Sequence, residues 1–250
     1  MIAGLEWIEL AYLAAVFAVG SFVRGFTGFG SSMIYVVGLT FAIPASEAVP
    51  LILILEVLAS AALLVGVWRQ VAWRSVTLLL LVCVAATPLG LALLAWLPPP
   101  PMQAVIACVV LGACLMLRSG WHLKEQPGVL GTVGVGTLSG ILTGSTSTGG
   151  PPIVLYYYSS PLPVAVARAS LIAFLGLADL FAGGMAAYKG LVVTETLLRV
   201  ALAAPIMFLG AWVGSLIFHR ADPDRFRRRV ILVLAALSVV SLGRALAAMP

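Results

Sequence analysis

Long apolar segments, separated by short polar or proline-rich turns, fill almost the whole chain. Ten such segments can be marked in the 250 residues, over 5–23, 31–43, 47–67, 75–96, 102–117, 128–143, 151–160, 164–187, 191–218 and 230–248. A bilayer core about 30 Å thick needs roughly 20 apolar residues per helix, so most of these segments are long enough to span it. Their solid runs of Leu, Val and Ala do not alternate with polar residues, unlike the strands of a transmembrane β-barrel. The pattern predicts an all-α, polytopic integral membrane protein.

Composition and charge agree with this fold class. Hydrophobic residues make up 62% of the chain and charged residues 9%, which is too little polar material to cover a soluble domain. The first segment carries Glu6 and Glu9 instead of a basic leader, so we expect a retained membrane helix. The net charge of +5 owes much to the five arginines between residues 220 and 229. The positive-inside rule places them in the cytoplasm and both termini outside, and we expect no nucleic-acid partner.

Two segments, 31–43 and 151–160, are too short to span a bilayer unaided, and each follows a glycine-rich stretch. The first glycine-rich stretch is residues 20–32, GSFVRGFTGFGSS, and the second is residues 140–152, GILTGSTSTGGPP. Non-helical backbone in lipid leaves N–H and C=O groups unpaired unless protein or water receives them. We therefore expect that a run such as residues 144–150 is not a lipid-facing helix and lines a cavity, and that each short segment is a half-helix or a re-entrant element.

The two halves of the chain show the same order of long and short segments. A shift of 120 residues also superposes Gly20 on Gly140 and Gly30 on Gly150. Each half holds an odd number of segments, so the second half must enter the membrane from the opposite face. We predict two inverted-topology repeats, residues 1–120 and 121–250, that form one compact transport unit with broken helices meeting near the midplane.

The glycine-rich stretches have the chemistry of an anion site. A half-helix that begins after such a loop presents free N–H groups and a partial positive charge. Nearby hydroxyl groups add donors, and glycines let the backbone approach a ligand. The candidate binding residues are Thr27, Gly28, Gly30, Ser31 and Ser32 in the first half, and Thr146, Ser147, Thr148, Gly149, Gly150 and Ser170 in the second. The alternative is that these small residues only allow close helix packing.

Three charged residues lie well inside apolar segments, where an ionised group costs about 3 kcal/mol or more. Arg24 adjoins the first glycine-rich stretch and is a candidate to neutralise a bound anion. Glu56 and Asp179 lie near the middle of the third segment of each half, which makes them candidate proton carriers. The alternative is a static ion pair between Arg24 and one of these acids, which would only fix the packing.

Three motifs connect these residues to a known family. They are Gly140-x3-Gly144-x4-Gly149-Gly150-Pro151-Pro152, Gly25-x2-Gly28-Phe29-Gly30 and Pro44-x2-Glu47-Ala48. In these motifs the chain resembles the TauE/SafE sulfite exporter family, also called the TSUP permeases, over almost its whole length. Where the family often has Gly-x-Gly-Gly-Pro, this chain has Ser147 in place of the first glycine. The resemblance implies a secondary transporter in the bacterial inner membrane that exports sulfite, sulfonates such as sulfoacetate, or related small sulfur anions.

Other functions fit the residues less well. A passive anion channel is the strongest rival, because it would use the same helix ends and hydroxyls without needing buried acids. An enzyme would need a base beside a nucleophile, yet the two histidines, His122 and His219, lie at segment ends. There is no HExxH motif, and we expect neither a metal nor a cofactor. The expected partners are a small anion and the lipid bilayer, and a homo-oligomer is compatible with the sequence.

Overall fold

The computed structural model describes residues 7–27, 29–118, 128–158, 161–218 and 223–249. These residues form ten α-helices and one short 3-10 helix, and no strand occurs among them, which confirms the predicted all-α class. The helices are α1 (Trp7–Thr27), α2 (Ser31–Leu39), α3 (Ala45–Val67), η1 (Trp68–Gln70), α4 (Trp73–Trp96), α5 (Pro99–Arg118), α6 (Val129–Thr146), α7 (Gly150–Tyr158), α8 (Val164–Tyr188), α9 (Thr194–Phe218) and α10 (Pro223–Ala247).

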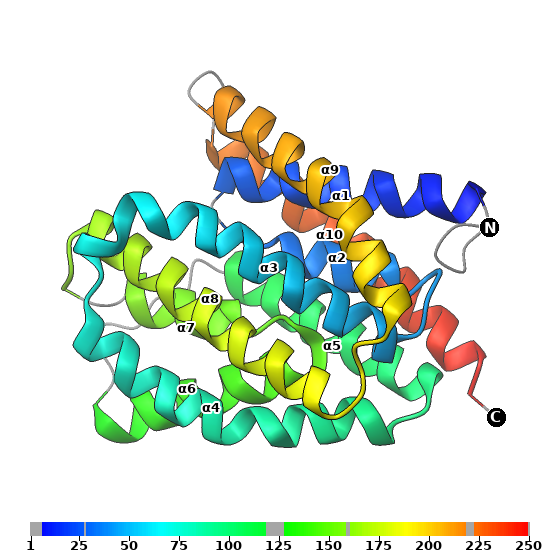
Figure 1. Ribbon diagram of the computed structural model, residues 1–250, viewed down its shortest axis with the longest axis horizontal. Helices are drawn as coiled ribbons and strands as arrows, with labels where there is room; N and C mark the ends of the chain where they lie inside the picture. The colour runs from blue at the N-terminus through cyan, green and yellow to red at the C-terminus, as the bar shows by residue number, and fades with distance from the viewer. Residues whose placement is uncertain (1–6, 28, 119–127, 159–160, 219–222, 250) are drawn as a thin grey trace.

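The helices form one bundle in which most axes follow the long direction of the molecule (Figure 1). The most extensive helix pairs are α4 with α6, α1 with α9, α5 with α10, and α3 with α8. All four pairs join a helix from the first five to a helix from the last five. The two halves of the chain are therefore interleaved and do not form separate domains.

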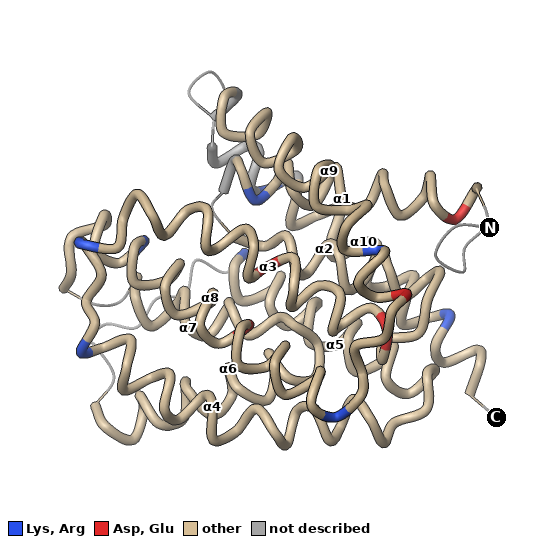
Figure 2. Tube along the Cα trace, viewed as in Figure 1, with Lys and Arg blue, Asp and Glu red and all other residues tan. Residues whose placement is uncertain are grey.

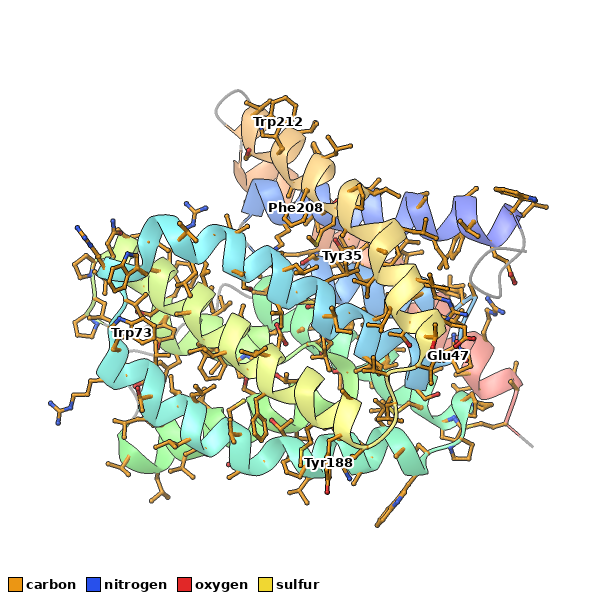
Figure 3. All side chains as sticks on the ribbon, in the orientation of Figure 1. Tyr35, Glu47, Trp73, Tyr188, Phe208 and Trp212 are labelled. Carbon is orange, nitrogen blue, oxygen red and sulfur yellow. The ribbon has the colours of Figure 1, made fainter. Side chains whose placement is uncertain are left out.

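The bundle has the features of a multi-pass membrane protein. Eight of the described helices are long and apolar enough to cross a membrane, whereas α2 and α7, with nine residues each, are not. Four of the five exposed tryptophans among the described residues lie at helix ends, as interfacial anchors do: Trp7, Trp68, Trp73 and Trp96. The fifth, Trp212, lies inside α9. Charged residues gather mainly at the two ends of the bundle (Figure 2), and side chains cover its lateral surface (Figure 3). The apolar sides between these ends are the surface that lipid would contact.

The glycine-rich stretches are more helical than the sequence suggested. The helix α1 continues to Thr27 and α6 to Thr146, so only residues 147–149 interrupt the second stretch. Within the run of residues 144–150 the break is therefore shorter than expected, since α6 includes residues 144–146 and α7 begins at Gly150. A helix satisfies its own backbone in lipid, and small residues let a second helix come close. A methyl group built on Gly144 would lie 2.5 Å from the Thr87 carbonyl oxygen, which shows how closely α6 approaches α4.

The start of α5 also differs from the prediction. We expected the fifth segment to begin after the proline run, at residue 102, but α5 begins at Pro99. Proline is accepted in the first turn of a helix, where its missing N–H would have no partner in any case. The proline run therefore ends one helix and begins the next.

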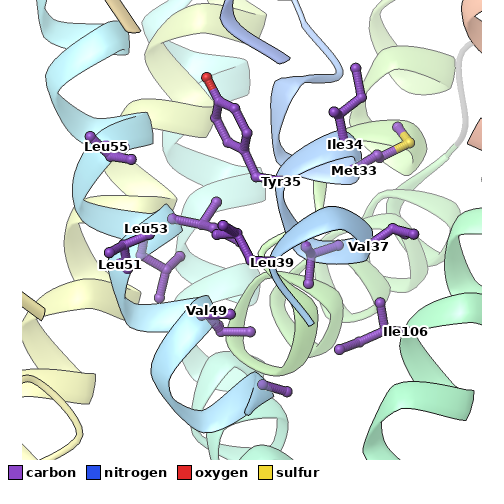
Figure 4. Packing of buried hydrophobic residues seen from close by; sticks show 14 of the residues in the cluster. Met33, Ile34, Tyr35, Val37, Leu39, Val49, Leu51, Leu53, Leu55 and Ile106 are labelled. Carbon is purple, nitrogen blue, oxygen red and sulfur yellow. The ribbon is translucent and has the colours of Figure 1, made fainter. Parts of the chain in front are cut away.

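The short helix α2 lies inside the protein. Eight of its nine residues are buried, and its apolar side chains join a large core with α1, α3, α5 and α10. Figure 4 shows Tyr35, Val37 and Leu39 of α2 packed beside Leu51 and Leu53 of α3. A second core joins α4, α7 and α8. Because both half-helices are buried, the polar groups at their N-termini are held inside the bundle.

The close contact between α4 and α6 gives a stability prediction. Changing Gly144 to Ala places a methyl group 2.9 Å from the Leu91 nitrogen, so the helices must separate. We expect a loss of about 1–3 kcal/mol, the usual cost of overpacking. The matched control is Gly134→Ala in the same helix, where a methyl group meets no atom within 4 Å among the described residues. Thermal unfolding of both variants in one detergent checks this, and equal melting temperatures would contradict it.

Candidate functional site

A fully buried network of charged and hydroxyl groups surrounds Arg24 in the last turn of α1. Its guanidinium forms an ion pair with the Glu56 carboxylate of α3. Nη1 also donates to Ser31 Oγ at 3.2 Å, and Nη2 donates to Ser60 Oγ at 2.9 Å. Ser31 Oγ in turn donates to Glu56 Oε1 at 2.5 Å. This network, which we call the Arg24 cluster, ties α1, α2 and α3 together.

The N-terminus of α2 lies at the Arg24 cluster. Gly30 precedes α2 with φ of 90°, a left-handed conformation that favours glycine. Gly30 has no side chain that could cap the helix, so Ser31 is the first residue that presents a polar side chain there. A helix N-terminus carries a partial positive charge, and here it adds to the charge of Arg24. The place is therefore suited to hold a carboxylate or another oxyanion.

Asp179 of α8 is a second carboxyl group beside the cluster. It is 5% exposed, and it interacts electrostatically with Arg24 and with Cys83 of α4. Gly176, one turn earlier in α8, allows the close approach, since a methyl group there would lie 2.7 Å from Ser60 Cβ. The cluster thus brings one cation together with both of the buried acids that the sequence singled out.

The second helix break, at residues 147–149, is closed by its own hydrogen bonds. The Ser147 N–H donates to the Thr143 carbonyl at 3.0 Å, and the Thr148 N–H donates to the Leu142 carbonyl at 3.3 Å. Ser147 adopts a left-handed φ of 55°, which is rare outside glycine. Its buried Oγ has no hydrogen-bond partner among the described residues. That hydroxyl is the free polar group that the second break contributes.

The other hydroxyls of the second stretch mainly serve the local backbone. Thr146 Oγ1 donates to the Leu142 carbonyl at 2.9 Å and lies 2.5 Å from Thr148 Oγ1. Ser139 Oγ donates to the Gly149 carbonyl at 2.7 Å. A methyl group on Gly149 would lie 2.6 Å from the Ser139 carbonyl oxygen, so this position accepts no side chain without a shift. These contacts hold the loop in one shape in front of α7.

Each of the two helix breaks, the first between α1 and α2 and the second at residues 147–149, has a neighbouring residue that packs toward α8 or the core around it. A methyl group on Gly150 would have Leu175 as its neighbour, at 3.8 Å, and Leu175 lies one turn before Asp179. From the first break, Phe29 packs against the core formed with α7 and α8. Ser170 lies nearer the start of α8, where its Oγ accepts a hydrogen bond from the Ala72 N–H at 2.9 Å. Ser170 thus anchors α8 to the segment before α4, away from the Arg24 cluster.

Sequence reasoning missed two members of this neighbourhood. Ser60 follows Glu56 by four residues and Tyr35 follows Ser31 by four, so each shares a helix face with a residue already identified. The Tyr35 hydroxyl is buried without a hydrogen-bond partner among the described residues, and it interacts electrostatically with Arg24. In Figure 4 this hydroxyl points away from Val37 and Leu39 of the apolar core. The spacing of four residues was the signal that would have found both.

Some predicted residues cannot be placed. Gly28, His122 and His219 lie outside the described residues, and so does the side chain of Thr27. The four members of the Arg24 cluster, Arg24, Ser31, Glu56 and Ser60, and the neighbouring Asp179 are each at most 5% exposed. The cluster is therefore closed to solvent on every side in this structure, and a solute can reach it only after a rearrangement.

A second ion pair lies at the start of α3, in its first turn. Glu47, which belongs to one of the family-like motifs, accepts a hydrogen bond from Arg199 Nη1 of α9 at 2.6 Å. Nearby, the Arg244 guanidinium of α10 lies 4.9 Å from the centre of the Phe41 ring. These contacts join both halves of the chain at the end of the bundle where α3 begins.

Comparison with known proteins adds to this geometry. The sequence model of the family described as Sulfite exporter TauE/SafE matches residues 12–241. The chain is 24% identical over 240 residues to the probable sulfite/organosulfonate exporter TauE of Cupriavidus necator, covering 92% of each chain. No solved structure matches the chain. Since the family match includes both glycine-rich stretches and the whole Arg24 cluster, the chain belongs to the TauE/SafE sulfite exporter family of membrane transporters.

Proposed function

We propose that this protein exports a small sulfur-containing anion, sulfite or an organosulfonate, across the bacterial inner membrane. The single observation that carries the proposal is the buried guanidinium of Arg24 at the N-terminus of α2. Charges at this depth in a membrane bundle usually belong to a transport pathway. Membership of the family supports the transporter role, and the name of the Cupriavidus necator relative supports the class of anion.

In this proposal the anion binds between the two helix breaks. Arg24 offers a planar fork of N–H donors, which matches sulfite and sulfonate oxygens well. Ser31 and the first N–H groups of α2 add donors from one side. From the other side come the Ser147 hydroxyl and the backbone at Gly149 and Gly150, while Thr146 and Thr148 hold that loop in place. A sulfur oxyanion would thus be held by one charge and many neutral donors.

Two inverted repeats, residues 1–120 and 121–250, would supply the alternating access. The packing supports this. In two repeats of five helices, α1 corresponds to α6 and α4 corresponds to α9, so the extensive pair of α1 with α9 corresponds to the extensive pair of α6 with α4. Helices α3 and α8 run antiparallel, since Ser60 faces Gly176 whereas Leu53 faces Gly183. Figure 1 likewise shows α5 and α10 running in opposite directions. One repeat rocking against the other would expose the Arg24 cluster to each side in turn.

The distribution of basic residues supports an orientation. Arg69, Arg74 and Arg118 lie where α3 meets α4 and where α5 ends, which is one end of the bundle. By the positive-inside rule this end faces the cytoplasm. The start of α1 and the end of α10 lie at the other end (Figure 1), so both would be outside. Glu47 and Arg199 then pair on the external side.

A conservative substitution of Arg24 tests the binding site. Arg24→Lys keeps the charge but loses the fork, and we expect kcat/KM for sulfite or sulfonate transport in proteoliposomes to fall about 10- to 100-fold. The matched control is Arg74→Lys, an exposed residue at the start of α4, which should transport like the wild type. Equal loss in both variants, or no loss in either, would contradict a substrate contact at Arg24.

A second experiment separates a transporter from the passive anion channel. A carrier must return its site across the membrane, so unlabelled sulfite on the far side should accelerate the flux of labelled sulfite several-fold at equal driving force. A channel has no such step, and its flux follows the gradient alone. Counterflow is measured in proteoliposomes for the wild type and for Gly112→Ala, which should behave alike because a methyl group there meets no atom within 4 Å among the described residues. Absence of acceleration would favour the channel.

A further inference from the structure

The charges of the Arg24 cluster leave no free cation for an arriving anion. Arg24 already carries the carboxylate of Glu56, and Asp179 adds a second carboxyl group nearby. The three side chains are 4%, 4% and 5% exposed, so bulk water does not screen them. If both acids are ionised the cluster has a net negative charge, and if one is protonated it is neutral. In neither case can a further anion bind without an uncompensated buried charge.

Glu56 also occupies the place that suits the cargo. Its two carboxylate oxygens contact Arg24 Nη1 and the Ser31 hydroxyl. These are the same charged fork and the same first turn of α2 that would receive an oxyanion. A sulfite or sulfonate group cannot take this position while the carboxylate remains there, because Nη1 and the Ser31 hydroxyl are already used. Only Arg24 Nε has no hydrogen-bond partner among the described residues of the cluster.

Among the described residues, no other charged group lies beside this site to compensate the charge of a further anion. Against α3, the helix of Glu56, pack α2, α8, α9, α4, α5, α6 and η1. These elements and α1 bring the following titratable or charged side chains: Glu9, Tyr12, Arg24, Tyr35, Arg69, Arg74, Cys83, Cys108, Cys114, Arg118, the tyrosines of α7, Arg168, Asp179, Tyr188, Glu195 and Arg199, with Lys189 directly after α8. Arg199 pairs with Glu47, about two and a half turns from Glu56. Among the described residues, the charged side chains that meet at this site are Arg24, Glu56 and Asp179.

We propose that Glu56 is an internal stand-in for the cargo, and that the anion and one proton replace the ion pair together. This inference rests on the proposed function and adds the number of protons that cross with each anion. When the oxyanion binds Arg24 and Ser31, the Glu56 carboxylate leaves Arg24 and takes one proton from water on the open side. When the anion leaves, the carboxyl releases that proton and pairs with Arg24 again. Each monoanion therefore crosses with one proton, and no net charge moves.

The pH dependence of binding tests the linkage on purified protein. Methanesulfonate is the probe, because its sulfonate stays ionised throughout the pH range in which the protein is folded. If anion binding frees Glu56 to take up one proton, the affinity of the protein for methanesulfonate should rise about tenfold for each unit by which the pH is lowered. This holds as long as Glu56 is ionised in the protein without bound anion. Glu56→Gln should bind methanesulfonate with an affinity that does not change with pH. The matched control Glu47→Gln, a 42% exposed carboxyl in the same helix, should keep the wild-type slope.

Flux measurements test the stoichiometry, with methanesulfonate and sulfite each loaded into proteoliposomes. For the wild type we expect one proton per methanesulfonate, and a final distribution that an imposed potential of about 100 mV leaves unchanged. An uncompensated monoanion would instead redistribute about 50-fold at that potential. Glu56→Gln should lose the proton movement and acquire the 50-fold dependence, and Glu47→Gln should behave like the wild type.

The outcomes separate the two proposals. Wild-type flux that carries net charge and no proton would overturn the stand-in role of Glu56 while leaving the exporter intact, and this result does not depend on any variant folding. Loss of the proton in Asp179→Asn but not in Glu56→Gln would overturn the assignment to Glu56. If neither anion moves through folded protein, the exporter proposal fails, and the present inference fails with it.

Discussion

The buried charge of Arg24 is the constraint on which the centre of this protein depends. A guanidinium cannot remain in a membrane bundle without partners, and two helices supply them, α2 through Ser31 and α3 through Glu56 and Ser60. Satisfying that charge fixes the end of α1 against α3 and places the N-terminus of α2 at the same point. Removing one partner of such a buried pair typically costs about 3–5 kcal/mol, so the cluster is both a binding element and a fold element.

The second half of the chain also has a helix break inside the bundle, but it closes that break without a buried charge. Under the proposed shift of 120 residues, Arg24 corresponds to Gly144 and Glu56 to Gly176. Gly144 packs against α4, and Gly176 lets α8 reach Ser60. The second break closes through hydrogen bonds between its own backbone and hydroxyl groups, as at Ser139 and Gly149. The two halves thus share an architecture while one carries the charge and the other supplies close packing.

Hydrophobic runs were enough to predict ten helical segments, including the two short ones, because segment length in lipid is dictated by the bilayer. They did not predict how far α1 and α6 enter the glycine-rich stretches. Glycine, serine and threonine are poor helix formers in water, but in lipid the helix is the conformation that satisfies its own backbone. The depth of Arg24, Glu56 and Asp179 was readable from sequence. Which acid pairs with Arg24 was not, since that depends on the rotation of α3 about its axis.

A binding site that carries its own counter-ion has a physical advantage for a transporter. An empty carrier must change conformation through the same low-dielectric interior as a loaded one, and a bare guanidinium would oppose that step. With Glu56 on Arg24 and Ser31, the guanidinium of the empty site has a counter-ion and most of its donors are occupied. The closed arrangement seen here, with every described member of the cluster buried, is what such an empty intermediate requires. Pairing within the protein therefore favours the return of the empty site, and exchange of that pair for cargo favours its passage when loaded.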